Sequence, residues 1–172
     1  MCEAPPGQLA KQRGPVRKEA VMKDIEIMKK VGFDKYFHTD SWEEANKLFF
    51  NLLAHKYDRL NDVISLGQQL EYRDAAISSL NLKQGMRVLD VCTGSGDMAI
   101  YMSQRCKGLH IDAVDVAEEM LSLAKDKVNQ LELKNISFYE ASALGLPFED
   151  NTFDAIMMCF GLRNFKDISL GL

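Results

Sequence analysis

Apolar residues recur at helical spacing through the first 80 residues and then give way to short continuous runs. From Glu19 to Lys30, Val21, Ile25 and Met28 are spaced four and three residues apart. This spacing places them on one face of a short helix, which Gly32 is expected to end.

A second helix is predicted to begin at Ser41. In the run Ser-Trp-Glu-Glu, Glu44 follows a hydroxyl by three residues, the pattern in which two side chains cap each other's backbone amides. The apolar face that follows is formed by Ala45, Leu48, Phe49 and Leu52. Further helical segments continue through 62–80, with a break near 65–67. We therefore expect residues 19–80 to form a helical amino-terminal segment that covers the substrate.

After residue 87 strands are predicted to alternate with helices. Four apolar runs indicate strands at 87–91, 110–115, 136–140 and 154–159. One helix is predicted before Gly108, and a second runs from Glu118 to Leu131. This alternation favours an α/β fold whose parallel sheet is covered on both faces.

The length of this second part limits the size of the sheet. Residues 81–172 have room for about three strand-plus-helix units, whereas a doubly wound sheet has two halves of about three strands each. Either the sheet is small or the chain is a piece of a longer protein.

Composition and charge exclude several classes of function. The 172 residues carry 21 basic and 25 acidic side chains, a net charge of −4 that argues against binding to nucleic acid. Residues 1–18 hold three of the four prolines and excess positive charge, which predicts a disordered arm, with a targeting segment as the minority interpretation. The longest apolar stretch, at 155–162, is too short for a transmembrane helix.

The cysteine pattern gives no indication of a metal site. The four cysteines include no CxxC pair and no spacing typical of zinc ligands. A reducing, intracellular setting fits them best. The sequence does not distinguish the cytoplasm from an organelle such as a plastid or mitochondrion.

A glycine loop follows the first predicted strand and indicates a cofactor site. Gly94, Ser95 and Gly96 would let the backbone approach a ligand while the amides of the next helix face it. The run 94–99 also fits the G-x-G-x-x-G/A fingerprint of dinucleotide-binding proteins. The glycines alone therefore do not identify the cofactor.

Charge around the loop favours one cofactor. Asp90 and Asp97 flank the loop with the wrong sign for a pyrophosphate. Asp115 follows Gly96 by 19 residues, where a carboxylate can accept hydrogen bonds from two ribose hydroxyls. S-adenosylmethionine combines an unphosphorylated ribose with a cationic amine and a sulfonium, so it fits best. The alternative is a plain turn flanked by ordinary helix-start carboxylates.

Several sequence blocks carry a resemblance to a known family. They are Val-Leu-Asp-Val-Cys-Thr-Gly-Ser-Gly-Asp (88–97), Val-Asp-Val-Ala-Glu-Glu-Met-Leu (114–121), Leu-Pro-Phe-Glu-Asp-Asn-Thr-Phe-Asp (146–154), Phe-Gly-Leu-Arg-Asn (160–164) and Ala-His-Lys-Tyr-Asp-Arg-Leu-Asn-Asp-Val-Ile-Ser-Leu-Gly (54–67). Together they resemble the class I S-adenosylmethionine-dependent methyltransferases that methylate a ring carbon of demethylated menaquinone, phylloquinone or ubiquinone precursors. The resemblance implies a Rossmann-like, doubly wound, mostly parallel sheet, with residues 81–172 supplying its first four strands and the carboxyl-terminal strands missing.

The resemblance also implies a set of cofactor-binding residues. It places Gly94, Ser95 and Gly96 at the methionine end and Asp115 on the ribose, with Asp90 favourable to the cationic amine. Ser142 and Ala143 would lie beside the adenine, and Cys159 would line the same pocket. Two positions depart from the common pattern of such methyltransferases, namely Cys92 in place of a glycine and Ser142 in place of an aspartate.

The same resemblance implies catalytic and substrate-binding residues. Arg163 would polarise the quinol oxygen and Asn164 would orient it, while Tyr57, Asp58 and Asn61 would close the pocket from the helical segment. Arg163 as a surface ion-pair partner and His55 as a participating base are the alternatives.

We therefore expect a C-methyltransferase that uses S-adenosylmethionine to methylate a hydrophobic prenylated quinol. The alternatives are a methyltransferase for another small molecule, a nicotinamide-dependent oxidoreductase and a non-catalytic cofactor-binding fragment. Whether the isolated chain is active is left open, as are a homodimer and peripheral association with a membrane.

Overall fold

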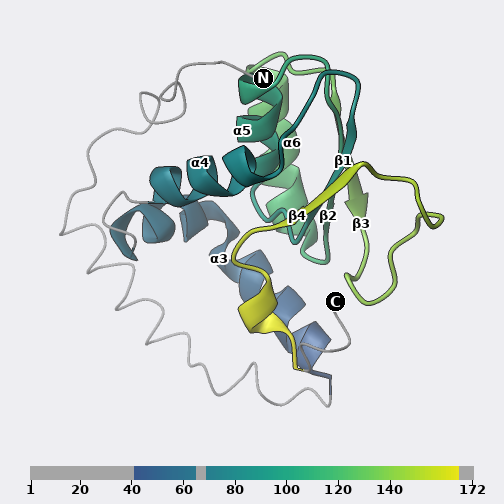
Figure 1. Cartoon of the computed structure of the whole chain (residues 1–172). Coiled ribbons are helices and arrows are strands. Elements are labelled where there is room, and N and C mark those ends of the chain that lie inside the picture. The colour runs from purple at the N-terminus through teal and green to yellow at the C-terminus, as the bar shows by residue number, and fades with distance from the viewer. Residues whose placement is uncertain (1–40, 65–68, 167–172) are drawn as a thin grey trace.

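The computed structural model describes residues 41–64 and 69–166 (Figure 1). The arm expected at 1–18 and the helix expected at 19–30 lie outside the described residues. The described part consists of a parallel sheet with helices packed against it and helix α3 lying across one end (Figure 1).

Helix α3 spans Trp42–Ile64 and begins where the capping pattern predicts. The backbone amide of Glu44 donates to Oγ of Ser41 at 3.4 Å, which is one half of the expected capping box. Ala54 is buried in the middle of α3, where it packs with Ala117 and Met120 of the second half of the chain. Helix α4 follows at Gln69–Ser79.

Four parallel strands form the sheet in the order β3-β2-β1-β4. Strands β1 (Arg87–Val91), β2 (His110–Asp115) and β3 (Ile136–Glu140) have the bounds predicted from the sequence. Strand β4, at Ala155–Met158, is shorter than the predicted 154–159. The chain turns immediately after it, because Phe160 has a φ of 63° that no strand residue adopts.

Helices α5 (Asp97–Arg105) and α6 (Glu118–Gln130) connect the first three strands. The connections from β1 to β2 and from β2 to β3 step in the same direction across the sheet, and such connections are right-handed. Both helices therefore lie on the same face of the sheet. Val88 and Ile111 point to that face, where they pack in one core with Ile100 and Met102 of α5.

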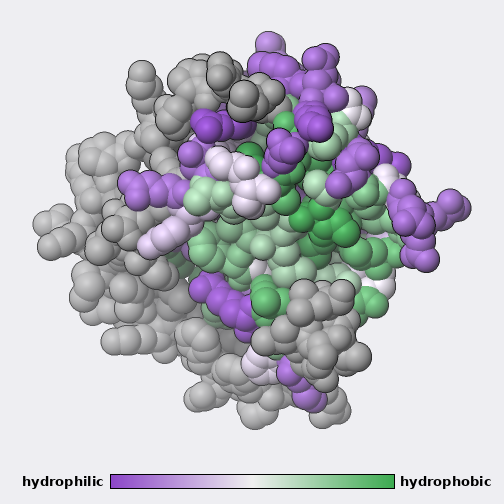
Figure 2. All heavy atoms as spheres, in the orientation of Figure 1, coloured by the Kyte–Doolittle hydropathy of each residue, from purple (hydrophilic) through white to green (hydrophobic). Residues whose placement is uncertain are grey.

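The other face of the sheet differs from the expectation of helices on both sides. Leu89 and Val91 pack there against the segment that connects β3 to β4, which contributes Phe148 and Phe153 and contains no helix. Ile156 of β4 is 60% exposed. In the space-filling view apolar side chains gather in the middle of the face turned toward the viewer (Figure 2). Within the described residues, all helices packed on the sheet therefore lie on one side.

Candidate cofactor and substrate site

A cavity of about 450 Å³ lies at the carboxyl ends of the strands. Every strand contributes to it through the residues that follow it, namely Cys92 and Gly94 after β1, Asp115 and Val116 at the end of β2, Ser142, Ala143 and Leu144 after β3, and Cys159, Phe160 and Gly161 after β4. The chain adds β2 and β3 on one side of β1 and then places β4 on the other side. Open parallel sheets bind ligands at such a switch point. The fold itself therefore indicates a ligand site here.

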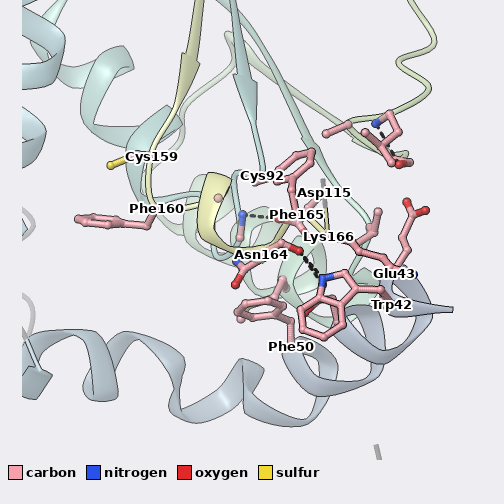
Figure 3. A pocket seen from close by; sticks show the side chains of 18 of the residues that line it. Trp42, Glu43, Phe50, Cys92, Asp115, Cys159, Phe160, Asn164, Phe165 and Lys166 are labelled. Carbon is pink, nitrogen blue, oxygen red and sulfur yellow. Dashed lines mark hydrogen bonds between the residues drawn. The ribbon is translucent and has the colours of Figure 1, made fainter. Parts of the chain in front are cut away.

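Helix α3 closes the cavity on the side away from the sheet. Trp42, Asn46, Phe50 and Tyr57 line it, at spacings that place them on one face of the helix. The carbonyl of Asn164 accepts hydrogen bonds from Nε1 of Trp42 and Nδ2 of Asn46, both at 2.8 Å (Figure 3). Of these four lining residues, the sequence analysis named Tyr57 alone. The four-residue spacing of Trp42, Asn46 and Phe50 could have indicated that these three residues share one face of the helix.

The two loop glycines have different neighbours. Gly94 lines the cavity, and a Cβ on it would meet Tyr57 at an ordinary 3.9 Å. A Cβ on Gly96 would lie 2.7 Å from Cβ of Ala124 in α6. Gly94 thus borders the ligand space, whereas Gly96 allows α6 to approach the loop.

Asp115 places a carboxylate in the cavity wall at the end of β2. Its Oδ2 accepts the amide of Gly94 at 2.8 Å, and its Oδ1 accepts the amide of Ala117 at 2.9 Å. Burial raises the pKa of Asp115, while these backbone hydrogen bonds favour its charged form. Each carboxylate oxygen has a second lone pair, so the group can still accept hydrogen bonds from a ligand.

Asp90 lies beneath the loop rather than in the cavity wall. Burial raises its pKa to about 7, although Oγ1 of Thr93 donates a hydrogen bond to its Oδ2 at 2.6 Å.

Burial also raises the pKa of Cys92 to about 12, with Asp115 and Asp90 contributing. The pKa of Cys159 is raised for the same main reason. Both thiols stay protonated at neutral pH, which fits small packing residues better than nucleophiles.

A network of charges joins the loop to three helices and corrects the charge argument made from the sequence. Asp97, at the start of α5, is buried and pairs with Arg73 of α4 at 3.1 Å and with Lys127 of α6 at 2.8 Å. Its charge is therefore compensated inside the protein. It does not present the uncompensated negative charge that the sequence analysis assigned to the loop.

Asp58 of α3 belongs to the same network. Its Oδ1 accepts the hydroxyl of Ser95 at 2.5 Å, and its Oδ2 pairs with Lys127. Ser95 itself is buried. Asp58 thus joins α3 to the glycine loop and to α6, and neither Asp58 nor Ser95 lines the cavity.

The structure brings together seven of the site residues proposed from the sequence. The seven that line the cavity are Tyr57, Gly94, Asp115, Ser142, Ala143, Cys159 and Asn164. Six others lie outside its lining, namely Asp58, Asn61, Asp90, Ser95, Gly96 and Arg163. Arg163 is exposed on the short 3₁₀ turn at Leu162–Asn164. In the part of the chain that the structure describes, no cluster of His, Cys, Asp and Glu side chains could hold a metal ion.

These features define a class of protein. A parallel sheet with a glycine loop after β1, an acidic residue at the end of β2 and a cavity at the switch point is the Rossmann-like fold of class I methyltransferases. The chain belongs to the ubiE/COQ5 methyltransferase family, which matches residues 38–172.

Two curated proteins similar to this chain share the name demethylmenaquinone methyltransferase. A demethylmenaquinone methyltransferase of Staphylococcus aureus (strain MRSA252) is 37% identical over 131 residues, which are 76% of this chain and 53% of that protein. One of Thermus thermophilus is 39% identical over 123 residues, which are 72% of this chain and 56% of that protein. The chain thus spans about half the length of the curated relatives it matches.

Solved structures show the same fold. A SAM-dependent methyltransferase from Aquifex aeolicus matches with a TM-score of 0.52 and 35% identity, over 58% of this chain and 53% of that one. The YcgJ protein of Bacillus subtilis matches with a TM-score of 0.54 and 26% identity, over 58% of this chain and 42% of that one. No helix among the described residues is long and apolar enough to cross a membrane.

Proposed function

We propose that this chain is the cofactor-binding part of an S-adenosylmethionine-dependent methyltransferase that methylates a ring carbon of a demethylated prenyl quinol. Membership of the ubiE/COQ5 family and the names of the relatives support the reaction. The observation that carries the proposal is the carboxylate of Asp115 in the wall of a cavity at the switch point, beside a glycine loop.

The residues present fit this cofactor. Gly94 has a φ of 57° and no side chain, which leaves space for a ligand against its backbone. Asp115 would receive the ribose hydroxyls, and Ser142 and Ala143 would lie beside the adenine. The cavity volume of about 450 Å³ is within the range of small-molecule sites.

Apolar residues around the cavity support a hydrophobic substrate. The lining includes Trp42, Phe50, Phe160 and Phe165, which are labelled in Figure 3, and also Leu144. Leu144 and Phe160 are 53% and 44% exposed, so the apolar lining reaches the protein surface. A quinol ring with a prenyl tail needs such a path, because its tail is too long to be enclosed with the ring.

The cofactor, when bound, supplies a methyl group whose bond to sulfur breaks as the bond to the ring carbon forms, and the hydrogen on that carbon leaves as a proton. The task of the chain is to orient the quinol and to stabilise charge on its oxygen. We assign orientation to the side chains of Asn164 and Tyr57, which line the cavity. Arg163 precedes Asn164 on the same turn, and its long side chain would polarise the oxygen directly or through water.

Binding of S-adenosylhomocysteine tests the proposal directly. We expect a calorimetric titration of the chain to show binding, and the fluorescence of Trp42 to change, because this single tryptophan lines the cavity. Asp115→Asn should weaken binding about 10- to 100-fold, since hydrogen bonds to a charged group contribute about 1.5–3 kcal/mol. Asp126→Asn is the matched control, because Asp126 is exposed on α6.

Two results would contradict the proposal. One is the absence of binding at millimolar S-adenosylhomocysteine, and the other is tighter binding of NAD than of the sulfur-containing ligand. Transfer of a labelled methyl group from S-adenosylmethionine to a demethylated quinol in detergent micelles then tests the reaction itself.

A further inference from the structure

The side-chain amide of Asn46 on α3 is only half used inside the protein. The residue is half-buried and lines the cavity. Its Nδ2 donates to the carbonyl of Asn164 at 2.8 Å. Its Oδ1 accepts no hydrogen bond from a residue in 41–64 or 69–166. One wall of the cavity therefore carries an amide oxygen that is available to a ligand.

The contact with Asn164 fixes which way round this amide lies. A carbonyl oxygen only accepts hydrogen bonds, so the nitrogen of Asn46, and not its oxygen, faces the carbonyl of Asn164. Nε1 of Trp42 donates to the same carbonyl at 2.8 Å and takes its second lone pair (Figure 3). A flip of the Asn46 amide would break one of these bonds and place two acceptors together. Oδ1 is therefore a fixed acceptor.

The surroundings of this acceptor make it selective. Trp42 and Phe50 lie about one turn before and after Asn46 on α3, and both line the cavity, as does Phe165. In such an apolar lining, a ligand that covers Oδ1 without donating a hydrogen bond removes its water and gives it no partner, which costs binding energy. A site of this kind favours a ligand that has a hydroxyl group over an analogue that lacks the hydroxyl hydrogen.

The place of Asn46 relates it to the substrate rather than to the cofactor. It is bound to the turn that follows β4, at one edge of the sheet, whereas Ser142 and Ala143, which we place beside the adenine, follow β3 at the other edge. Asn164 of the same turn is the residue to which we assign orientation of the quinol. A quinol ring has two hydroxyl groups that donate, whereas the oxidised quinone has two carbonyl oxygens that only accept.

We propose that Oδ1 of Asn46 accepts a hydrogen bond from a ring hydroxyl of the quinol, and that this contact makes the site select the reduced ring over the oxidised one. The inference rests on the proposed function. It adds a specificity-determining residue that lies outside the sequence blocks carrying the family resemblance.

A pair of probes isolates this contact. A prenylated 1,4-dihydroxynaphthalene has two ring hydroxyls, and its 1,4-dimethoxy ether has the same ring and tail with no donor. The measured quantity is the preference, which is the Kd of the ether divided by the Kd of the diol. It comes from anaerobic calorimetric titrations of the whole chain in detergent micelles, with saturating S-adenosylhomocysteine. Asn46→Leu should lower the preference about 3- to 10-fold, because a neutral hydrogen bond is lost.

Two further variants separate the acceptor from the anchoring donor. Asn46→Asp keeps an acceptor and loses the donor to Asn164, so it should retain the preference. Trp42→Phe removes the other donor to the same carbonyl and leaves Oδ1 in place, so it should also retain the preference.

Asn51→Leu is the matched control. Asn51 is a second half-buried asparagine on α3, but its Oδ1 accepts the backbone amide of Glu119 at 3.1 Å and it lies outside the cavity lining. Its replacement should leave the preference unchanged. Thermal unfolding shows whether each variant is folded, and Asn46→Ala replaces Asn46→Leu if the latter does not fold.

The outcomes separate this inference from the proposed function. An unchanged preference in Asn46→Leu, an equal loss in Asn46→Asp, or an unchanged chain without preference for the diol would overturn the role of Asn46 and leave the proposed function standing. A loss of S-adenosylhomocysteine affinity in Asn46→Leu beyond about twofold would assign the oxygen to the cofactor and also overturn it. An unchanged chain that binds neither S-adenosylhomocysteine nor the diol would overturn both.

Discussion

Gly96 and Gly85 share a left-handed backbone but differ in their surroundings. Their φ angles are 77° and 88°, a region that costs residues with a Cβ about 1 kcal/mol or more. A Cβ on Gly85 would meet nothing within 4 Å, whereas one on Gly96 would collide with Ala124. The pair therefore separates the cost of the backbone conformation from the cost of close packing.

We expect Gly96→Ala to lower the free energy of unfolding by about 2–4 kcal/mol, because strain and overpacking add. Gly85→Ala, with strain alone, should lower it by about 1–2 kcal/mol. Urea unfolding measures both. Ala124→Gly in the Gly96→Ala background should recover part of the loss, and equal costs at the two glycines would contradict the packing argument.

Asp90 makes stability depend on pH in an unusual direction. Burial raises its pKa from 3.8 to about 7, so the folded state holds this proton more tightly than the unfolded state. The stabilising contribution is complete below pH 3.8 and is lost as the pH rises to about 7. Linkage converts this shift into a loss on the order of 4 kcal/mol.

We expect Asp90→Asn to remove this dependence, because an amide does not titrate in this range. The free energy of unfolding of the unchanged chain, minus that of Asp90→Asn, should fall between about pH 4 and pH 7 and stay constant above that range. Other carboxyl groups cancel in the difference. A difference that is independent of pH over this interval would show that Asp90 titrates normally in the folded state.

At the scale of elements, side-chain contacts join α3 to the turn after β4, to the end of β3, to the glycine loop and to α6. Trp42 and Asn46 bind the carbonyl of Asn164, Lys47 pairs with Glu140 at the end of β3, and Asp58 contacts Ser95 and Lys127. These contacts join residues far apart in sequence. They position the helix that closes the cavity.

Lys127→Met should loosen this attachment. The side chains of Lys127 and Asp58 are 24% and 27% exposed, so their pairing is only partly screened by water. We expect the free energy of unfolding to fall by about 1–2 kcal/mol. Asp58→Asn should add less in the Lys127→Met background than alone, because both changes break one contact. Lys125→Met, exposed on the same helix, is the control, and additive effects would exclude a shared contact.

The sequence predicted the bounds of the helices and strands better than the contacts between them. The bounds of β1, β2 and β3 followed from short apolar runs, and the start of α3 from its capping residues. The attachment of α3 could not be read in this way, because Trp42 and Asn164 are 122 residues apart and no local pattern encodes their meeting. The pairing of Asp97 with Arg73 and Lys127 was missed for the same reason.

At the scale of the whole molecule, the cavity is assembled from both halves of the described chain. Seven of the proposed site residues line it, because the carboxyl ends of parallel strands meet at one edge and the family resemblance located the positions there. The helical wall was missed, since it depends on how α3 folds back over that edge. The observed sheet also differs from the predicted one, because its described helices lie on one face only.

The hydrogen bond from Trp42 to the carbonyl of Asn164 has a consequence for synthesis of the protein on the ribosome. Translation proceeds at about 5–20 residues per second, so 122 residues take roughly 6–24 s. During that interval α3 has been synthesised, but the turn that contains Asn164 has not. The indole N–H of Trp42 has no such acceptor until the turn is made, so α3 can take its final place over the cavity only after the turn at Leu162–Asn164 has been synthesised.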